Sequence, residues 1–144
     1  MSNVRKMLLI AEVKPNEVVF DLGSGDGRFI ITAAKEFHAR SVGIEANPLW
    51  VLWTHGQILL SRLAGRVRIF WGNFYQMDLS EADVVILYLL QGTNNKLKQK
   101  LETELKLGTR VVSHYFTFLD WRPIETDSSS HIYLYEIGNH RYPS

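Results

Sequence analysis

Apolar residues along the chain follow two patterns in turn, one with the period of a helix and one typical of a buried strand. Helical spacing recurs over residues 4–13, 28–37 and 48–63, and again in a stripe formed by Leu97, Leu101 and Leu105. Short continuous apolar runs lie between and after these segments and predict strands buried on both faces. The predicted strands cover residues 17–20, 41–44, 67–71, 83–88 and 110–115.

Residues with strong positional preferences mark the ends of two predicted helices. Asn47 can cap the helix that begins with Pro48, and Gly65 can end it. Thr93 can cap the next helix, which Gly108 can end. After residue 115 the alternation of helices and strands stops. Residues 121–126 and 131–137 predict two further strands, joined by a turn at 127–130.

Strands that alternate with helices favour right-handed crossovers and therefore an α/β fold with a mostly parallel sheet. A terminal pair of strands joined by a short turn has to be antiparallel. We therefore expect a doubly wound, Rossmann-like sheet of about seven strands with an antiparallel edge. The chain has 144 residues, the length of one domain, and we expect that domain to extend over residues 1–144.

Composition and charge argue against several classes of function. The chain has 16 Lys and Arg against 15 Asp and Glu, so its net charge of +1 argues against stable nucleic-acid binding. It has no cysteine, and its five histidines are not spaced as metal ligands, so we expect no metal site. No apolar run is long enough to span a bilayer, and the first residues lack a signal-peptide cleavage site. We therefore expect a cytoplasmic protein without a transmembrane segment.

A glycine-rich loop, DLGSGDGR at residues 21–28, falls in the first strand-to-helix turn, where doubly wound sheets bind ligands. Its glycines allow a tight turn and a close approach of the backbone to a ligand. The spacing is G-x-G-x-G, and Arg28 stands where the dinucleotide fingerprint has its third glycine, which disfavours NAD. The loop residues that we expect to contact a cofactor are Asp21, Gly23, Ser24, Gly25, Asp26 and Gly27.

The charges near this loop favour a cationic adenosine cofactor. Asp21 and Asp26 would repel a pyrophosphate, whereas they suit the ammonium and sulfonium groups of S-adenosylmethionine. Glu45 ends the second strand and can accept hydrogen bonds from ribose hydroxyls, which NAD and S-adenosylmethionine share. Asn73 follows the third strand and can bond the adenine edge while Phe74 covers the face of the ring.

The motifs VVFDLGSGDGR and VGIEANP resemble the first two cofactor motifs of class I, seven-β-strand S-adenosylmethionine-dependent methyltransferases. The stretches GNFYQMDLSEADVVILYLL, KLKQKLETELKLGTRVVSHYF and HIYLYEIG are similar to a small protein-lysine methyltransferase family. That family includes broad-specificity archaeal enzymes. It also includes mitochondrial enzymes that methylate lysines of the ATP synthase c-subunit and of the adenine nucleotide translocase.

The resemblance implies a class I methyltransferase fold, S-adenosylmethionine as the methyl donor and S-adenosylhomocysteine as the product. It also implies a protein substrate with an exposed lysine. Members of the family usually have more sequence before the first helix, whereas 17 residues precede Val18 here, so we expect part of the cofactor lid or substrate groove to be missing. A domain this small without a cap should also have a broadly open cofactor pocket, which suits a residue on a protein surface. Enzymes that methylate adenine or glutamine amides carry Asn/Asp-Pro-Pro-Tyr after the fourth strand. Residues 87–90 are LYLL instead, which does not support that chemistry.

An acceptor slot should form beyond the carboxyl ends of the fourth and fifth strands. There Tyr88 is the candidate for orienting an amine, and His114 is the candidate for accepting its proton. Each can instead be an ordinary residue at the end of its strand. Trp50 and Trp53, about one helical turn apart, are expected to pack in the core or at an edge rather than to contact the substrate.

The sequence predicts an S-adenosylmethionine-dependent N-methyltransferase that acts on the ε-amine of protein lysines by in-line displacement. One alternative is a methyltransferase for RNA or for a small molecule. Another is a noncatalytic module that binds an adenosine ligand without turnover.

Overall fold

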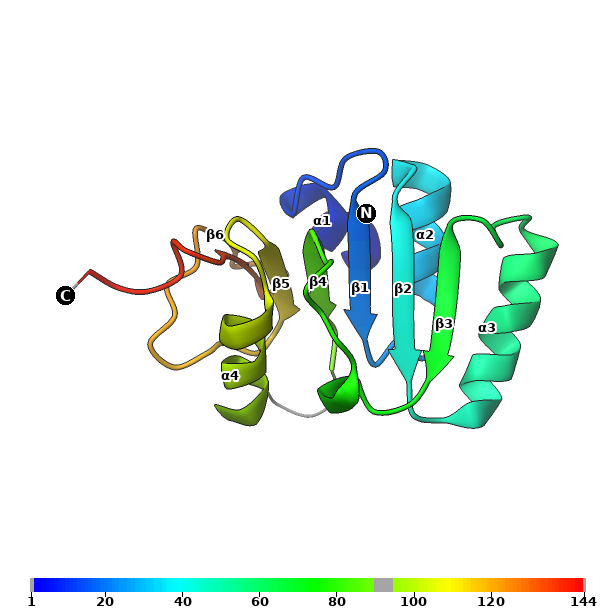
Figure 1. Ribbon diagram of the computed structural model, residues 1–144. Coiled ribbons are helices and arrows are strands. Elements are labelled where there is room, and N and C mark those ends of the chain that lie inside the picture. The colour runs from blue at the N-terminus through cyan, green and yellow to red at the C-terminus, as the bar shows by residue number, and fades with distance from the viewer. Residues whose placement is uncertain (1, 90–94, 144) are drawn as a thin grey trace.

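The computed structural model describes residues 2–89 and 95–143, and its strands form one seven-stranded sheet in the order β3-β2-β1-β4-β5-β7-β6 (Figure 1). β1 to β5 run parallel, β7 is antiparallel to β5, and β6 is antiparallel to β7. This topology confirms the predicted doubly wound, mostly parallel sheet with an antiparallel edge. The strands are β1 (Val18–Leu22), β2 (Arg40–Glu45), β3 (Val67–Trp71), β4 (Val84–Leu87), β5 (Arg110–His114), β6 (Glu125–Asp127) and β7 (Ile132–Glu136).

Helices cover both faces of the sheet, because the central strands are apolar on both sides. In Figure 1, α1 (Asn3–Ile10) and α2 (Arg28–Phe37) lie behind the sheet, while α4 (Asn95–Glu104) lies in front of it. α3 (Pro48–Leu60) packs beside the edge strand β3. Successive side chains of a strand point to opposite faces of the sheet, so alternate residues join the core on one face or the other. Val84 and Ile86 of β4 join the core beneath α1 and α2, whereas the residues between and after them join the core beneath α4.

Several helix ends differ from the sequence prediction because the backbone turns left-handed early. α1 ends at Ile10 rather than near residue 13. Glu12 has a φ of 52°, which is incompatible with a continued right-handed helix. α3 ends at Leu60 rather than near residue 63. Arg62, two residues later, has a φ of 58°. The expected helix cap Thr93 lies outside the described residues. None of the helices within the described ranges is long and apolar enough to cross a membrane.

The predicted strand 121–126 is shorter than expected. Only Glu125–Asp127 pairs with β7, and Trp121 instead forms an isolated bridge with Arg141. Pro123 lies between these two pairings and has no N–H to donate to a ladder, which explains the interruption.

Candidate functional site

A cavity of about 740 Å³ opens at the carboxyl ends of the central strands, next to the point where the strand order reverses between β2-β1 and β1-β4. Ligands bind at this position in doubly wound sheets, and the volume suits a nucleoside-sized molecule. The lining residues that the sequence had singled out for the cofactor or the reaction are Asp21, Gly23, Ser24, Gly25, Asp26, Glu45, Phe74 and Tyr88.

The loop between β1 and α2 owes its shape to glycine. Gly23, Gly25 and Gly27 have φ values of 83°, 56° and 84°, which other residues rarely adopt. A Cβ on Gly27 would lie 2.7 Å from Cγ2 of Thr54 on α3, so this glycine lets the loop pack against that helix. Gly27 does not line the cavity, and its expected contact with a cofactor stays a prediction.

Gly43 in β2 is a second glycine that allows close packing, here beneath the loop. Its role was not predicted from the sequence. A Cβ there would lie 2.9 Å from the side chain of Ser24 and 2.8 Å from that of Ile30. A glycine inside a strand often marks such an approach, and this signal could have identified the position.

Asp21 is the most unusual group in the cavity. Its side chain is 1% exposed, and neither carboxylate oxygen has a hydrogen-bond partner among the described residues. Burial raises the pKa of Asp21 to about 8, and the nearby carboxylates of Glu45 and Asp26 add to the effect. A buried carboxylate without a partner is unfavourable unless a cation or a strong donor meets it. The ammonium and sulfonium of S-adenosylmethionine provide such charge, so the site fits this cofactor.

Glu45 stands at the end of β2 and is held in place by the backbone. Its Oε1 accepts a hydrogen bond from the Gly25 N–H at 2.7 Å, and its Oε2 accepts one from the Asn47 N–H at 2.8 Å. Each oxygen keeps a further lone pair that can accept a hydroxyl. The carboxylate therefore both orders the loop and presents acceptors to the cavity, as a ribose-binding residue requires.

Asp26 is not a free negative charge in the structure. It forms an ion pair with Arg28, with 2.8 Å between Nη2 and Oδ2. Hydrogen bonds from that guanidinium hold the pKa of Asp26 below its usual range. Asp26 was expected to act with Asp21 in repelling a pyrophosphate, and its pairing with Arg28 weakens that expectation. A contact between Asp26 and the cofactor stays a prediction.

The segment after β3 brings an aromatic wall to the cavity. Asn73 caps the short helix η1 (Phe74–Gln76), and its Oδ1 accepts a hydrogen bond from the Tyr75 N–H at 2.9 Å. Asn73 is exposed and does not line the cavity, so its bond to adenine stays a prediction. Phe74 does line it, together with Tyr75 and Trp50, which were not predicted to do so.

Aromatic rings form a continuous row at the ends of β4 and β5. Tyr88 packs on Phe29 at 5.3 Å between ring centroids and stacks on His114 at 4.6 Å. His114 meets the edge of Tyr115, which stacks in turn on His131 at 4.6 Å. The structure therefore brings the two predicted reaction-site residues together, and it adds Tyr115 and His131, which were not predicted from the sequence.

His114 is set up to be neutral. Burial lowers its pKa, and the neighbouring His131 lowers it further. Its Nε2 lies 3.4 Å from the Asn3 amide nitrogen. The neutral imidazole can accept a proton, but the lowered pKa makes it a weaker base, and His114 does not line the cavity. Its role as a proton acceptor stays a prediction.

The expectation that Trp50 and Trp53 pack in the core or at an edge was wrong. Their side chains are 43% and 55% exposed. α3 buries Val51, Thr54 and Ile58 against the sheet instead, and the tryptophans lie on its outer surface. Only Trp50 borders the cavity.

Comparisons with known proteins give a consistent family. A model of the ANTKMT methyltransferase domain matches residues 21–125. A protein-lysine N-methyltransferase of Saccharolobus islandicus is 47% identical over 145 residues, covering 96% of this chain and 90% of that protein. An ATP synthase c-subunit lysine N-methyltransferase of Xenopus laevis is 31% identical, covering 98% of this chain but 61% of the relative.

A solved structure adds information about the cofactor. It comes from Salinibacter ruber and is described as an RNA methyltransferase in complex with S-adenosyl-L-homocysteine. It matches with a TM-score of 0.90 and 39% identity, covering 98% of this chain and 93% of that one.

Proposed function

Because the chain belongs to the ANTKMT methyltransferase domain family, we propose that it is an S-adenosylmethionine-dependent protein-lysine N-methyltransferase. The observation that carries the proposal is the 47% identity, over 96% of this chain, with an archaeal protein-lysine N-methyltransferase. The family and fold also confirm the resemblance that the sequence motifs suggested. We further propose that residues 1–144 act as one methyltransferase domain.

Three residues of the cavity would each bind a different part of the cofactor. Asp21 would hold a cationic group, Glu45 would accept hydrogen bonds from the ribose, and Phe74 would cover a face of the adenine. When bound, S-adenosylmethionine supplies an electrophilic methyl group on its sulfonium. The complex of the Salinibacter ruber structure with S-adenosylhomocysteine supports this choice of cofactor.

The acceptor end has to deliver a neutral amine in the correct orientation. A lysine with an ordinary pKa of about 10.4 needs about 4 kcal/mol to lose its proton near neutral pH. An apolar slot and a nearby positive charge both lower that pKa. Tyr88, which lines the cavity, would orient the amine through its hydroxyl. His114 stacks on the Tyr88 ring behind it, and its lowered pKa favours the neutral form that could take the proton. Orientation of this kind can contribute roughly 7–11 kcal/mol to lowering the barrier.

RNA is the second candidate acceptor, because the Salinibacter ruber protein is described as an RNA methyltransferase. With a net charge of +1, the chain lacks the strong positive field that gives RNA-binding proteins most of their affinity. The curated lysine methyltransferases among its relatives also favour a protein acceptor.

Transfer of a labelled methyl group into a cell lysate separates these acceptors. We expect the labelled product to be degraded by protease treatment and to be unaffected by nuclease treatment. Label that nuclease removes would identify an RNA acceptor instead. Asp21→Asn is the matched control, since it removes the cofactor-facing charge while keeping the shape of the side chain. Equal labelling by this variant would contradict the proposed site.

The expected cytoplasmic location and the expected lack of stable nucleic-acid binding stay predictions. Fractionation of cells and a titration with RNA would test them.

A further inference from the structure

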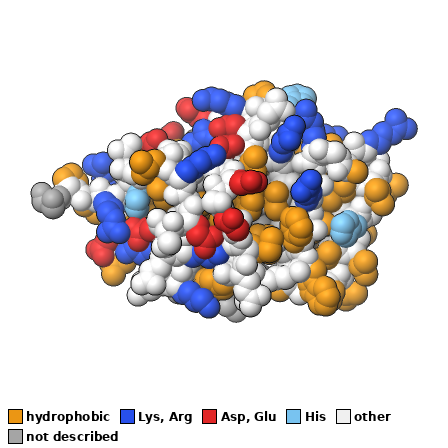
Figure 2. Space-filling model, viewed as in Figure 1, with side chains coloured by type: hydrophobic (Ala, Val, Ile, Leu, Met, Phe, Trp, Pro, Cys, Tyr) orange, Lys and Arg blue, Asp and Glu red, His pale blue; other side chains and the backbone are white. Residues whose placement is uncertain are grey.

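An apolar surface covers the outside of α3 and the adjoining edge of the sheet. Figure 2 shows hydrophobic side chains gathered at this end of the molecule, over α3 and β3. We define the α3–β3 surface by its exposed side chains, which are Leu49, Leu52, Trp53, Leu59, Leu60 and Phe70. Their exposed fractions run from 40% to 81%. At roughly 200 Å² per large side chain, these fractions amount to about 800 Å² of apolar area.

That area is large for a protein that functions alone. The largest apolar patch on a typical monomer covers about 300–600 Å². A stable interface between two proteins buries about 800 Å² on each partner. The α3–β3 surface therefore has the area that one side of a stable dimer needs.

The apolar residues of α3 are spaced as in a helix that packs against a neighbour on two sides. Val51, Thr54 and Ile58 face the sheet of the same chain. Leu49, Leu52, Gly56 and Leu59 follow one another at intervals of three, four and three, which places them on the opposite side of the helix. Trp53 and Leu60 lie beside this row and widen it into a stripe. A helix in contact with water on that side would carry polar residues there. The stripe has the pattern of a seam between two helices.

Gly56 lies in the middle of this stripe, with leucines and Trp53 on either side of it. A Cβ at this position would meet nothing within 4 Å among the described residues, so the chain's own packing does not require glycine. Glycine inside a helix lowers its stability relative to alanine. What glycine does provide is a notch, where the backbone of a second helix can approach closely.

The charge pattern also suits self-association. Residues 48–60 contain no Asp, Glu, Lys or Arg. In a twofold dimer the same patch faces itself, so a charge near the axis would lie opposite its own copy. A lipid surface would accept the same leucines and tryptophans, but it would gain nothing from a notch at Gly56. The combined pattern favours a helix from a second copy.

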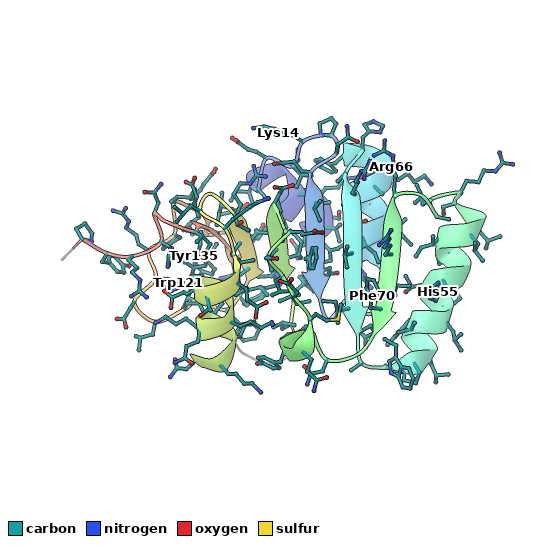
Figure 3. The ribbon with its side chains drawn as sticks, viewed as in Figure 1. Lys14, His55, Arg66, Phe70, Trp121 and Tyr135 are labelled. Carbon is teal, nitrogen blue, oxygen red and sulfur yellow. The ribbon has the colours of Figure 1, made fainter. Side chains whose placement is uncertain are left out.

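We propose that two copies of the chain pack their α3–β3 surfaces together, with the two α3 helices antiparallel and crossing at Gly56. A groove of about 440 Å³ beside the stripe, between α3 and β3, receives side chains of the partner copy. His55 of α3 and Phe70 of β3, which are labelled in Figure 3, both line this groove. Leu49 of the surface is followed by Trp50, which lines the cofactor cavity, so the surface begins next to that cavity. β5 lies on the other side of the sheet centre (Figure 1).

Sedimentation of the full chain over about a hundredfold range of concentration tests the proposal. We expect the mass to rise from 16.6 kDa towards twice that value. Leu52→Glu and Leu60→Glu should stay at the lower mass throughout. The matched control is Leu119→Glu, which changes an equally exposed leucine outside the surface and should dimerise like the unaltered chain.

Gly56→Leu separates a packing role from a folding role. Leucine favours the helix more than glycine does, so the variant should fold at least as stably, yet dimerise at least tenfold more weakly because the notch is filled. A chain that stays at 16.6 kDa at every concentration would overturn the proposal. So would a Gly56→Leu variant that dimerises normally. Monomers that bind mixed phosphatidylcholine–phosphatidylglycerol vesicles through Leu52 and Leu60 would assign the surface to lipid instead.

Discussion

Affinity for S-adenosylhomocysteine should rise with pH, because Asp21 has to lose its proton before it can hold the ammonium group of the ligand. Burial raises the pKa of Asp21 to about 8 in the ligand-free protein, so this carboxyl is mostly neutral at pH 7. A bound cation lowers that pKa. By linkage, ligand binding therefore releases a proton below pH 8, and the affinity falls as the pH falls.

The expected change follows from the ionised fraction of Asp21. With a pKa of about 8, roughly 1% of the carboxyl is ionised at about pH 6 and about half at pH 8, so affinity should rise about fiftyfold across this range. Calorimetric titration at several pH values measures the affinity. Repeating each titration in buffers with different ionisation enthalpies counts the protons released.

Asp21→Asn is the control that isolates this group. Titration of the ligand is common to both proteins, whereas only the unaltered protein has a carboxyl at position 21. We expect the variant to bind more weakly at pH 8 and to show a nearly flat pH dependence. An unaltered protein whose affinity is constant between about pH 6 and pH 8, or a variant with the same slope, would rule out this linkage.

The same carboxyl should destabilise the ligand-free fold as the pH rises. Its pKa is about 8 in the folded chain and about 3.9 in an unfolded one, so between these values the folded state binds more protons. Stability is then highest below the lower pKa and is lost as the pH rises through the higher one. Asp21→Asn should remove that loss, which is on the order of a few kcal/mol and can be measured by urea unfolding at several pH values.

The remaining predictions concern the loop, the acceptor slot and the C-terminal segment. Glu45→Ala should weaken S-adenosylhomocysteine binding by more than about tenfold in calorimetry, since the carboxylate also orders the glycine loop. Gly27→Ala should lower Tm by about 5 °C or more, whereas Gly65→Ala, with open space around it, should change it little. Tyr88→Phe should reduce kcat about tenfold with a smaller effect on the cofactor KM, and an unchanged kcat would show that the hydroxyl has no role. Glu102→Gln should cost about 1–3 kcal/mol in urea unfolding, because this carboxylate accepts hydrogen bonds from three side chains. In the unaltered protein that contribution should be lost as the pH falls through the lowered pKa of Glu102.

The shape of the glycine loop could be predicted because its information is local. Residues 21–28 lie in one turn, and the rule that ligands bind at the carboxyl ends of parallel strands places Glu45 near them. Asp26 shows the limit of that reasoning. Its position was predictable, but its neutralisation by Arg28 depends on a side-chain geometry that the sequence does not contain.

The row of aromatic rings at the ends of β4 and β5 could be predicted only in part, because it depends on contacts between distant segments. Tyr88 and His114 follow from the ends of adjacent strands. Tyr115 and His131 stack because both have positive φ values and because β5 pairs with β7 in a particular antiparallel register. Neither feature leaves a recognisable mark in the sequence.

The outer surface of α3 was misjudged for a different reason. Apolar periodicity identifies residues that avoid water, but it does not show which partner covers them. Trp53 was therefore assigned to the core or an edge, although the structure exposes 55% of it. Apolar periodicity, interpreted as burial within the chain, cannot identify residues that are covered by a partner outside it.

The proposed reaction is the transfer of a methyl group to the ε-amine of a protein lysine. It can be tested by labelling a lysate with the enzyme and tritiated S-adenosylmethionine, hydrolysing the labelled protein, and separating its amino acids. We expect label in methylated lysines, and greatly reduced label with Asp21→Asn. Label confined to another amino acid or to nucleosides would contradict the assigned acceptor.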